Sequence, residues 1–148
     1  MNIEVSFPGG KRVIAQVGDF EIETDQPEEL GGAGSAPAPY DLFLASLATC
    51  AGIYVLGFCQ ARGIPTEGLR LTQENEFDLE TKLVRRVRIE LQLPPNFPEK
   101  YRAAIVRTAE NCKVKKTLAA TPMFEVDVVP SSDVAPTIRK AEVACASA

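Results

Sequence analysis

The chain has 148 residues, a formal net charge of −4, and ordinary shares of apolar (45%) and charged (24%) residues. This length fits one domain with a real core, and the composition excludes disordered and fibrous proteins. The mild acidity predicts no basic surface that would bind nucleic acid or an anionic membrane.

The N-terminal part of the chain predicts three strands. Apolar alternation indicates strands over residues 3–7, 11–17 and 20–24, and a Pro-Gly-Gly turn joins the first two. A loop rich in Gly, Pro and Ala follows, over residues 26–39. The first residues lack the basic start and the apolar core of a signal peptide, so we expect a cytoplasmic protein.

A long helix is predicted from Pro39 to about Ala61. Proline suits the first helical turn, and Asp41 favours the positive end of the helix dipole. Residues 42–60 carry no charge and are numerous enough to span a bilayer. Their many small side chains, without flanking basic clusters or an aromatic belt, favour the buried centre of a soluble protein instead.

The second half of the chain predicts a hairpin, two helices and a last strand. The hairpin joins a strand over about 69–77 to a cleaner one over 83–93, whose apolar face is formed by Leu83, Val87, Ile89, Leu91 and Leu93. An amphipathic helix over 98–111, a short helix over about 114–119 and a strand over 124–129 follow. Residues 131–148 predict a loose tail that includes Cys145.

These elements predict a single α+β domain over residues 1–130. A small sheet can cover only one side of a helix that is apolar on every face. A single chain would leave the other side in water, which favours a homodimer with the long helix at the interface.

The cysteines are the residues with the most distinctive chemistry. Cys50 lies near the centre of the uncharged helix, and Cys112 follows the second predicted helix. In a cytosolic chain of this size, four cysteines indicate free thiols, with one pair a candidate for redox chemistry. Cys50 could also be simple packing, since buried cysteine is common.

Several other site types are excluded by the composition. The chain has no histidine, which rules out Ser-His-Asp and Cys-His arrangements and the HExxH zinc site. The cysteines lie 9, 53 and 33 positions apart, without the close pairs that a four-cysteine zinc site uses. The Gly-Gly-Ala-Gly at 31–34 lacks the Lys-Ser/Thr of a P-loop.

Two motifs stand in order along the chain. The first joins Glu-Leu-Gly-Gly-Ala-Gly at 29–34 to Pro-Tyr-Asp-Leu-Phe-Leu-Ala-Ser-Leu-Ala-Thr-Cys at 39–50, and the second is Ala-Glu-Asn-Cys-Lys-Val at 109–114. With the order of elements, they resemble the OsmC/Ohr family, the osmotically inducible and organic hydroperoxide resistance proteins, in a general OsmC-like form. The resemblance implies an intertwined homodimer, with long helices between curved antiparallel sheets and active sites near the interface.

The resemblance also implies a thiol-dependent peroxidase that reduces organic hydroperoxides in oxidative stress defence. The thiolate of Cys50 would attack the peroxide and become a sulfenic acid, and Cys112 would condense with it to a disulfide. An external dithiol would reduce this disulfide back to two thiols. No metal or other cofactor is implied.

Such a thiolate needs a nearby cation, because apolar surroundings raise the pKa of a thiol. The Gly-Gly-Arg segment of the family corresponds to Gly-Gly-Lys-Arg at 9–12, so Lys11 takes the aligned place and Arg12 follows. Neighbours on a strand point to opposite faces, so either could supply the charge, and Arg12 does so if it points inward. Arg85, on the apolar face of the hairpin, is a third candidate, although a solvated side chain is favoured there.

The start of the long helix departs from the family pattern. Hydroperoxide-resistance members carry Glu ten residues before the reactive cysteine, where this chain has Tyr40, followed by Asp41. Asp41 either orients a cation or substrate, or is a helix-start carboxylate. The missing Glu supports a second hypothesis, a non-catalytic dimer that binds an apolar or thiol-containing small molecule. Cys59, on the opposite side of the helix from Cys50, is expected in the core.

Overall fold

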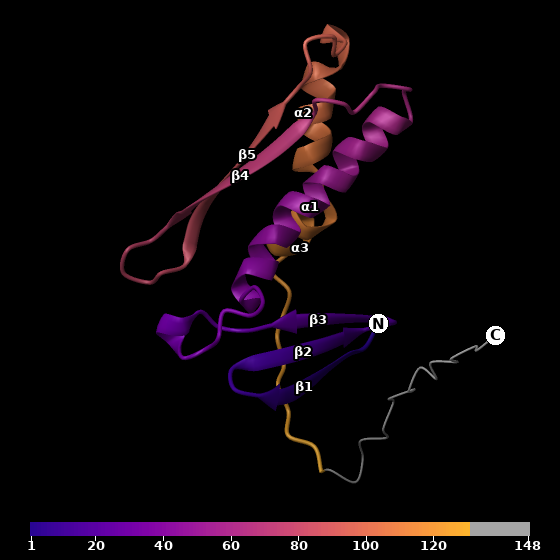
Figure 1. The fold of residues 1–148 in the computed structure, drawn as a ribbon. Coiled ribbons are helices and arrows are strands. Elements are labelled where there is room, and N and C mark those ends of the chain that lie inside the picture. The colour runs from indigo at the N-terminus through magenta and orange to yellow at the C-terminus, as the bar shows by residue number, and fades with distance from the viewer. Residues whose placement is uncertain (131–148) are drawn as a thin grey trace, which may run out of the picture.

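A computed structural model describes residues 1–130 of the chain. The N-terminal strands β1 (Ile3–Gly9), β2 (Arg12–Val17) and β3 (Phe20–Thr24) form an antiparallel sheet in that order (Figure 1). Its register aligns apolar residues in two cross-strand rows, which are Ile3–Val17–Phe20 and Val5–Ala15–Ile22. Because residues two apart share a face, both rows lie on the same side of the sheet. Polar side chains such as Glu4, Gln16 and Glu21 form the other side.

A tight loop connects this sheet to the long helix and contains a short 3-10 helix, η1 (Glu28–Leu30). The buried Asp25 organises the loop, since its carboxylate accepts hydrogen bonds from the backbone N–H groups of Gln26, Ala33 and Ser35 and from the Ser35 hydroxyl, at 2.8–3.1 Å. These bonds lower the pKa of Asp25 from its ordinary value of 3.8 to about 2, the bonds from Ser35 being the largest cause.

Helix α1 (Pro39–Gln60) confirms the predicted central helix. Proline stands at its first position, and the Asp41 carboxylate accepts a hydrogen bond of 3.1 Å from the backbone N–H of Ala38. The side that faces the rest of the chain is buried, through Leu44, Leu47, Ala51, Val55, Phe58 and Cys59. By length and composition alone the helix could also cross a membrane, a test that core helices of soluble proteins pass as well.

The predicted hairpin forms from β4 (Arg70–Phe77) and β5 (Val84–Gln92). One detail of the prediction was wrong: Val84, not Leu83, continues the apolar face of the second strand. Glu76 pairs with Arg86 but Phe77 pairs with Val84, so Arg85 is the extra residue of a β-bulge. A bulge shifts the alternation by one position, which leaves Leu83 62% exposed.

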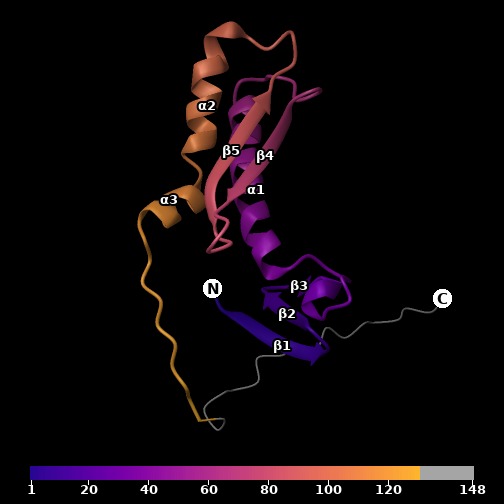
Figure 2. The ribbon, with the colours of Figure 1, turned by 90° about the vertical axis from the view of Figure 1, so that its left-hand side faces the viewer.

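The second predicted helix begins with a 3-10 turn, η2 (Glu99–Tyr101), and continues as α2 (Arg102–Glu110), followed by α3 (Lys113–Ala119). The core lies where α1, α2 and the inner face of the hairpin meet, and its buried residues include Val55, Phe58, Ile105 and Ala109. In Figures 1 and 2 the hairpin and α2 flank α1, whereas the β1–β3 sheet lies beyond the N-terminal end of the helix.

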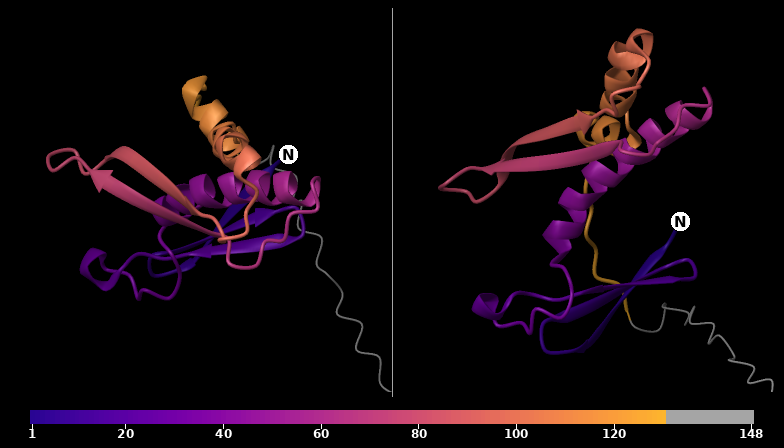
Figure 3. Two further views of the ribbon diagram at one scale, coloured as in Figure 1. Left: turned by 90° about the horizontal axis from the view of Figure 1, so that it is seen from above. Right: turned by 45° about the horizontal axis from the view of Figure 1, so that its top comes forward.

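The predicted strand over 124–129 was wrong for the single chain, because residues 120–130 form no regular secondary structure. This segment leaves α3 as an extended trace (Figure 3), and Val126 and Val128 are 95% and 100% exposed. The alternation of Phe124, Val126 and Val128 with acidic residues suits a strand, but a strand needs a neighbour with free N–H and C=O groups. The expected tail over 131–148, with Cys145, lies outside the described residues.

Candidate functional site

The two cysteines of the predicted pair come together where α1 meets the start of α3. Cys50 is a partly exposed residue near the middle of α1, and Cys112 is fully buried. Helix α2 ends before Cys112, where the backbone N–H and side-chain amide of Asn111 both donate hydrogen bonds to the carbonyl of Arg107. Cys112 itself has an extended backbone and accepts the first α3 hydrogen bond, from Lys116. This turn places the backbone N–H groups at the start of α3 next to the Cys50 sulfur.

The surroundings of Cys50 favour its thiolate. Hydrogen bonding from the backbone N–H of Val114 is the largest cause that lowers the pKa of Cys50, with further contributions from the Cys112 thiol, the N–H of Lys113 and the charge of Lys115. Partial burial of the sulfur acts in the opposite direction, and the net pKa is lowered. Thiolate character is what makes a cysteine nucleophilic, so these surroundings make Cys50 a candidate nucleophile.

An apolar groove of about 690 Å³ is formed by α1, the hairpin, α2 and α3. Helix α1 contributes Phe43 and Leu47 to its wall, and Leu47 is one turn before Cys50. The remaining wall residues are Val84, Val87, Ile89, Leu91 and Leu93 of the hairpin, Arg102, Val106, Ala109 and Glu110 of α2, and Lys115 and Leu118 of α3. The groove can therefore hold an apolar group of a few carbon atoms between the same elements that carry the two thiols.

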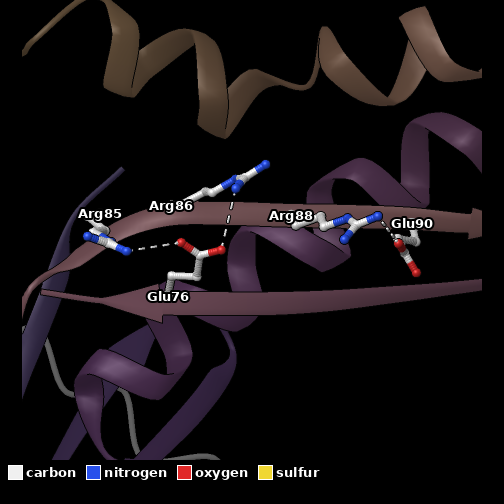
Figure 4. A network of polar contacts seen from close by, with 5 residues as sticks. All are labelled: Glu76, Arg85, Arg86, Arg88 and Glu90. Atoms are coloured by element: carbon white, nitrogen blue, oxygen red, sulfur yellow. Dashed lines mark hydrogen bonds and ion pairs between the residues drawn. The ribbon is translucent and has the colours of Figure 1, made fainter.

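The basic residues expected to serve Cys50 lie elsewhere in the described chain. The side chain of Lys11 lies over Gly31 in the loop before α1, and Arg12 is exposed at the start of β2, with no side-chain hydrogen bond or ion pair among residues 1–130. Arg85 and Arg86 both pair with Glu76, at 3.6 and 3.5 Å, in an exposed network on the hairpin (Figure 4). The side chain of Arg85 is thus solvated, which is the interpretation that the sequence favoured.

Asp41 and Tyr40, at the start of α1, have structural contacts with the helix end and with the hairpin. Asp41 makes the contact of a helix-start carboxylate, described above. The hydroxyl of Tyr40, which stands where the family pattern has Glu, accepts a hydrogen bond of 3.1 Å from the backbone N–H of Val84. Its ring stacks on Phe43 with centroids 5.7 Å apart. Tyr40 therefore joins α1 to the bulged end of the hairpin.

Cys59 is fully buried in the core, as expected, and burial raises the pKa of its thiol. Among residues 1–130, no three His, Cys, Asp or Glu side chains are grouped to hold a metal ion. Sequence reasoning missed Lys115 and the backbone donors of Lys113 and Val114. The available signal was the run Lys-Val-Lys-Lys directly after Cys112, which puts three cations within four positions of a thiol.

The geometry agrees with comparisons to known proteins. A family model described as OsmC-like protein matches residues 32–127, which is more than half of the chain. The chain belongs to the OsmC-like family. The match runs from the loop before α1 through both cysteines to the segment after α3. No curated protein sequence matches this OsmC-like chain significantly.

Several solved structures share the OsmC-like fold. A candidate osmotic stress induced and detoxification response protein from Psychrobacter arcticus 273-4 has 25% identity and a TM-score of 0.68, over 79% of this chain and 87% of that one. An OsmC-like protein from Mycoplasma pneumoniae has 17% identity and a TM-score of 0.61, over 81% and 87%. An organic hydroperoxide resistance protein OsmC from Legionella pneumophila has 22% identity and a TM-score of 0.52, over 80% and 89%.

Proposed function

We propose that this OsmC-like protein is a cytoplasmic thiol-dependent peroxidase that reduces organic hydroperoxides in oxidative stress defence. The observation that carries the proposal is the contact between a thiol of lowered pKa, Cys50, and a second buried thiol, Cys112. A peroxidase of this kind needs a thiolate that attacks the peroxide and a second thiol that resolves the resulting sulfenic acid. Cys50 and Cys112 lie close enough together to take these two roles. The Legionella protein of similar fold is described as an organic hydroperoxide resistance protein.

The proposed reaction has three balanced steps. The Cys50 thiolate attacks the terminal oxygen of ROOH, which breaks the O–O bond and leaves Cys50 as a sulfenic acid. The departing alkoxide takes up a proton and leaves as the alcohol. Cys112 then attacks the Cys50 sulfur, forming a disulfide and releasing water. An external dithiol reduces this disulfide by thiol–disulfide exchange and is itself oxidised.

The apolar groove supports an organic rather than an inorganic peroxide. Its wall is formed mainly by aliphatic side chains, including Leu47 and Val106. An alkyl group gains free energy when it leaves water for such a wall, whereas hydrogen peroxide has no apolar part to bury. The groove would hold the R group while the peroxide oxygens reach the sulfur.

We also propose that the functional form is a homodimer. The apolar face of the β1–β3 sheet is largely uncovered in one chain, with Phe7 and Phe20 79% and 75% exposed. Ile53 and Tyr54 of α1 are exposed as well. Exposed apolar surface of this kind marks an interaction site in soluble proteins, and a second copy of the chain offers a surface of the same kind.

Mass spectrometry of the reduced protein tests the peroxidase. One equivalent of tert-butyl hydroperoxide should convert Cys50 and Cys112 to a disulfide within seconds and release tert-butanol. The variant C50S should form no disulfide, and C112S should stop at the sulfenic acid. The matched control is C59S, which should behave as the wild type because Cys59 is buried and its thiol pKa is raised. Intact thiols under excess peroxide would leave the second hypothesis, a dimer that binds small molecules without catalysis.

A further inference from the structure

Tyr40 links the start of α1 to the bulged end of the hairpin through three contacts. Its hydroxyl accepts a hydrogen bond of 3.1 Å from the backbone N–H of Val84. Its ring stacks on Phe43, with centroids 5.7 Å apart and planes at 22°, and lies 6.5 Å from the ring of Phe77. Within residues 1–130, the bond to Val84 is the only side-chain hydrogen bond between α1 and β5.

The residues that Tyr40 contacts on α1 and on β5 are both part of the wall of the apolar groove. Phe43 is the first residue of α1 in this wall, and Val84 is the first residue of β5. Tyr40 precedes Phe43 by three residues and reaches from there to Val84, without being part of the wall itself. Its side chain therefore stands across the end of the groove that is nearest the start of α1.

This end of the groove is apolar, because three aromatic rings gather there. The charged wall residues lie elsewhere. Arg102 begins α2, whereas Glu110 and Lys115 flank the turn that carries Cys112. An alkyl group is stabilised beside apolar side chains, and polar atoms are stabilised where they keep hydrogen-bonding partners. We expect the apolar part of a ligand to point towards Tyr40.

Tyr40 is too far from the thiols to take part in the chemistry. It precedes Cys50 by ten residues, which corresponds to about 15 Å along the helix. Neither cysteine is part of the groove wall, so Tyr40 acts on a ligand only through Phe43 and Val84. A change at Tyr40 should therefore alter which apolar groups bind and leave the reactivity of Cys50 as it is.

The contacts of Tyr40 are compatible with the proposed homodimer, because all of them lie within one chain. The exposed apolar residues assigned to the dimer above, which are Phe7, Phe20, Ile53 and Tyr54, are not wall residues of the groove. Each copy would therefore keep its own groove and its own Tyr40. A groove filled by the second copy would admit no small ligand, and ligand binding distinguishes these two cases.

We propose that Tyr40 sets the length limit of the groove: its ring closes the apolar end and stops an alkyl group that extends towards the start of α1. Tyr40 is a positioning residue, since it acts through Phe43 and Val84. The inference rests on the proposed function for the identity of the ligand, the R group of a hydroperoxide. Where hydroperoxide-resistance members carry Glu, this chain would thus have an aromatic determinant of substrate length.

The test is the binding of linear alcohols, the products of the corresponding hydroperoxides, to the intact, reduced protein. Isothermal titration calorimetry gives the dissociation constants for the series from 1-butanol to 1-dodecanol. In the wild type the affinity should rise about fourfold per buried methylene and level off where the chain meets Tyr40. In Y40A the rise should continue to longer alcohols, and the longest should bind at least about fourfold more tightly than to the wild type.

Two further variants separate the length limit from a general loss of structure. Y40F keeps the ring and should keep the wild-type limit. L83A is the matched control, since it removes an exposed side chain beside Val84 that is not part of the wall. A merely structural role of Tyr40 would weaken the binding of all alcohols alike and would not move the limit.

Circular dichroism and a thermal melt check that Y40A is folded. If it is not, Y40L carries the test, because leucine is shorter than tyrosine but still covers Phe43. An unchanged limit in the folded variant would overturn the proposal, as would a wild-type protein that binds none of the alcohols.

Alcohol binding requires no peroxide turnover, so its result is independent of the disulfide assay. The limit could move in Y40A while no disulfide forms, or stay fixed while the disulfide forms as in the wild type. With an active enzyme, Y40A should lower the KM for decyl hydroperoxide and leave kcat unchanged, because only binding of the alkyl group changes.

Discussion

The buried carboxylate of Asp25 holds together the loop that leads from the N-terminal sheet to α1. Asp25 directly follows β3, and its hydrogen bonds reach across the loop to Ala33 and Ser35, close to the start of α1. All four bonds are donated to the ionised carboxylate, which explains why the pKa of Asp25 falls to about 2. The loop between the N-terminal sheet and α1 is thus held in part by hydrogen bonds to one charged residue.

The Asp25 carboxylate predicts a specific loss of stability in acid. Its pKa is lower in the folded protein than its ordinary value of 3.8, so its contribution is complete above pH 4 and is lost as the pH falls towards 2. D25N should lower the melting temperature at pH 7, and the gap to the wild type should shrink between pH 4 and pH 2. D19N, in the exposed turn before β3, is the control. A gap that stays constant down to pH 2 would contradict this account.

At the scale of elements, the loop between β3 and α1 brings the backbone of Gly32 into close contact with the backbone of Gln26. An added Cβ at Gly32 would lie 1.8 Å from the carbonyl oxygen of Gln26, so no side chain fits there. At Gly34 an added Cβ would meet no atom within 4 Å, and only the φ of +59° disfavours a side chain. The two glycines therefore serve different purposes in one loop.

This difference predicts unequal costs for two alanine substitutions. G32A should lower the free energy of unfolding by about 2 kcal/mol, because backbone has to move. G34A should cost about 1 kcal/mol, the usual penalty of a left-handed conformation for alanine. Urea unfolding at one fixed protein concentration measures both values. A cost for G32A no greater than that of G34A would show that the loop relaxes freely.

The elements also show how far the sequence alone reaches. Period and capping signals were sufficient for α1 and for all five observed strands, because those signals are local. The bulge at Arg85 was not predictable, since only pairing with β4 shows that Val84 takes the apolar face. The cysteine motifs identified the pair Cys50 and Cys112. A cation for Cys50 was sought on a strand, because a resemblance transfers positions and does not transfer the packing that brings the start of α3 to this thiol.

At the scale of the whole molecule, one chain leaves much of its apolar surface in water. The rows Ile3–Val17–Phe20 and Val5–Ala15–Ile22 form one sheet face without a covering layer of its own. The segment that alternates Phe124, Val126 and Val128 with acidic residues is extended and unpaired within residues 1–130. A second copy would supply both a cover for the sheet and an edge strand for the segment.

The proposed homodimer has a direct test in solution. Size-exclusion chromatography with light scattering should give twice the mass of the chain for the wild type at micromolar concentration. F20E puts a charge on the apolar face and should weaken the dimer more than about tenfold. E21Q changes the next residue on the polar face and should leave the mass unchanged. A wild-type monomer at every concentration would contradict the dimer.

The burial of Cys112 against Cys50 has a consequence for the lifetime of such an enzyme. A sulfenic acid at Cys50 would find its resolving thiol already in place, and well-oriented intramolecular reactions reach effective molarities far above any cellular peroxide concentration. Ring closure would then outpace a second oxidation to the sulfinic acid, which is irreversible for most proteins. The same packing that hides Cys112 from solvent would thus protect the catalyst from inactivation by excess substrate.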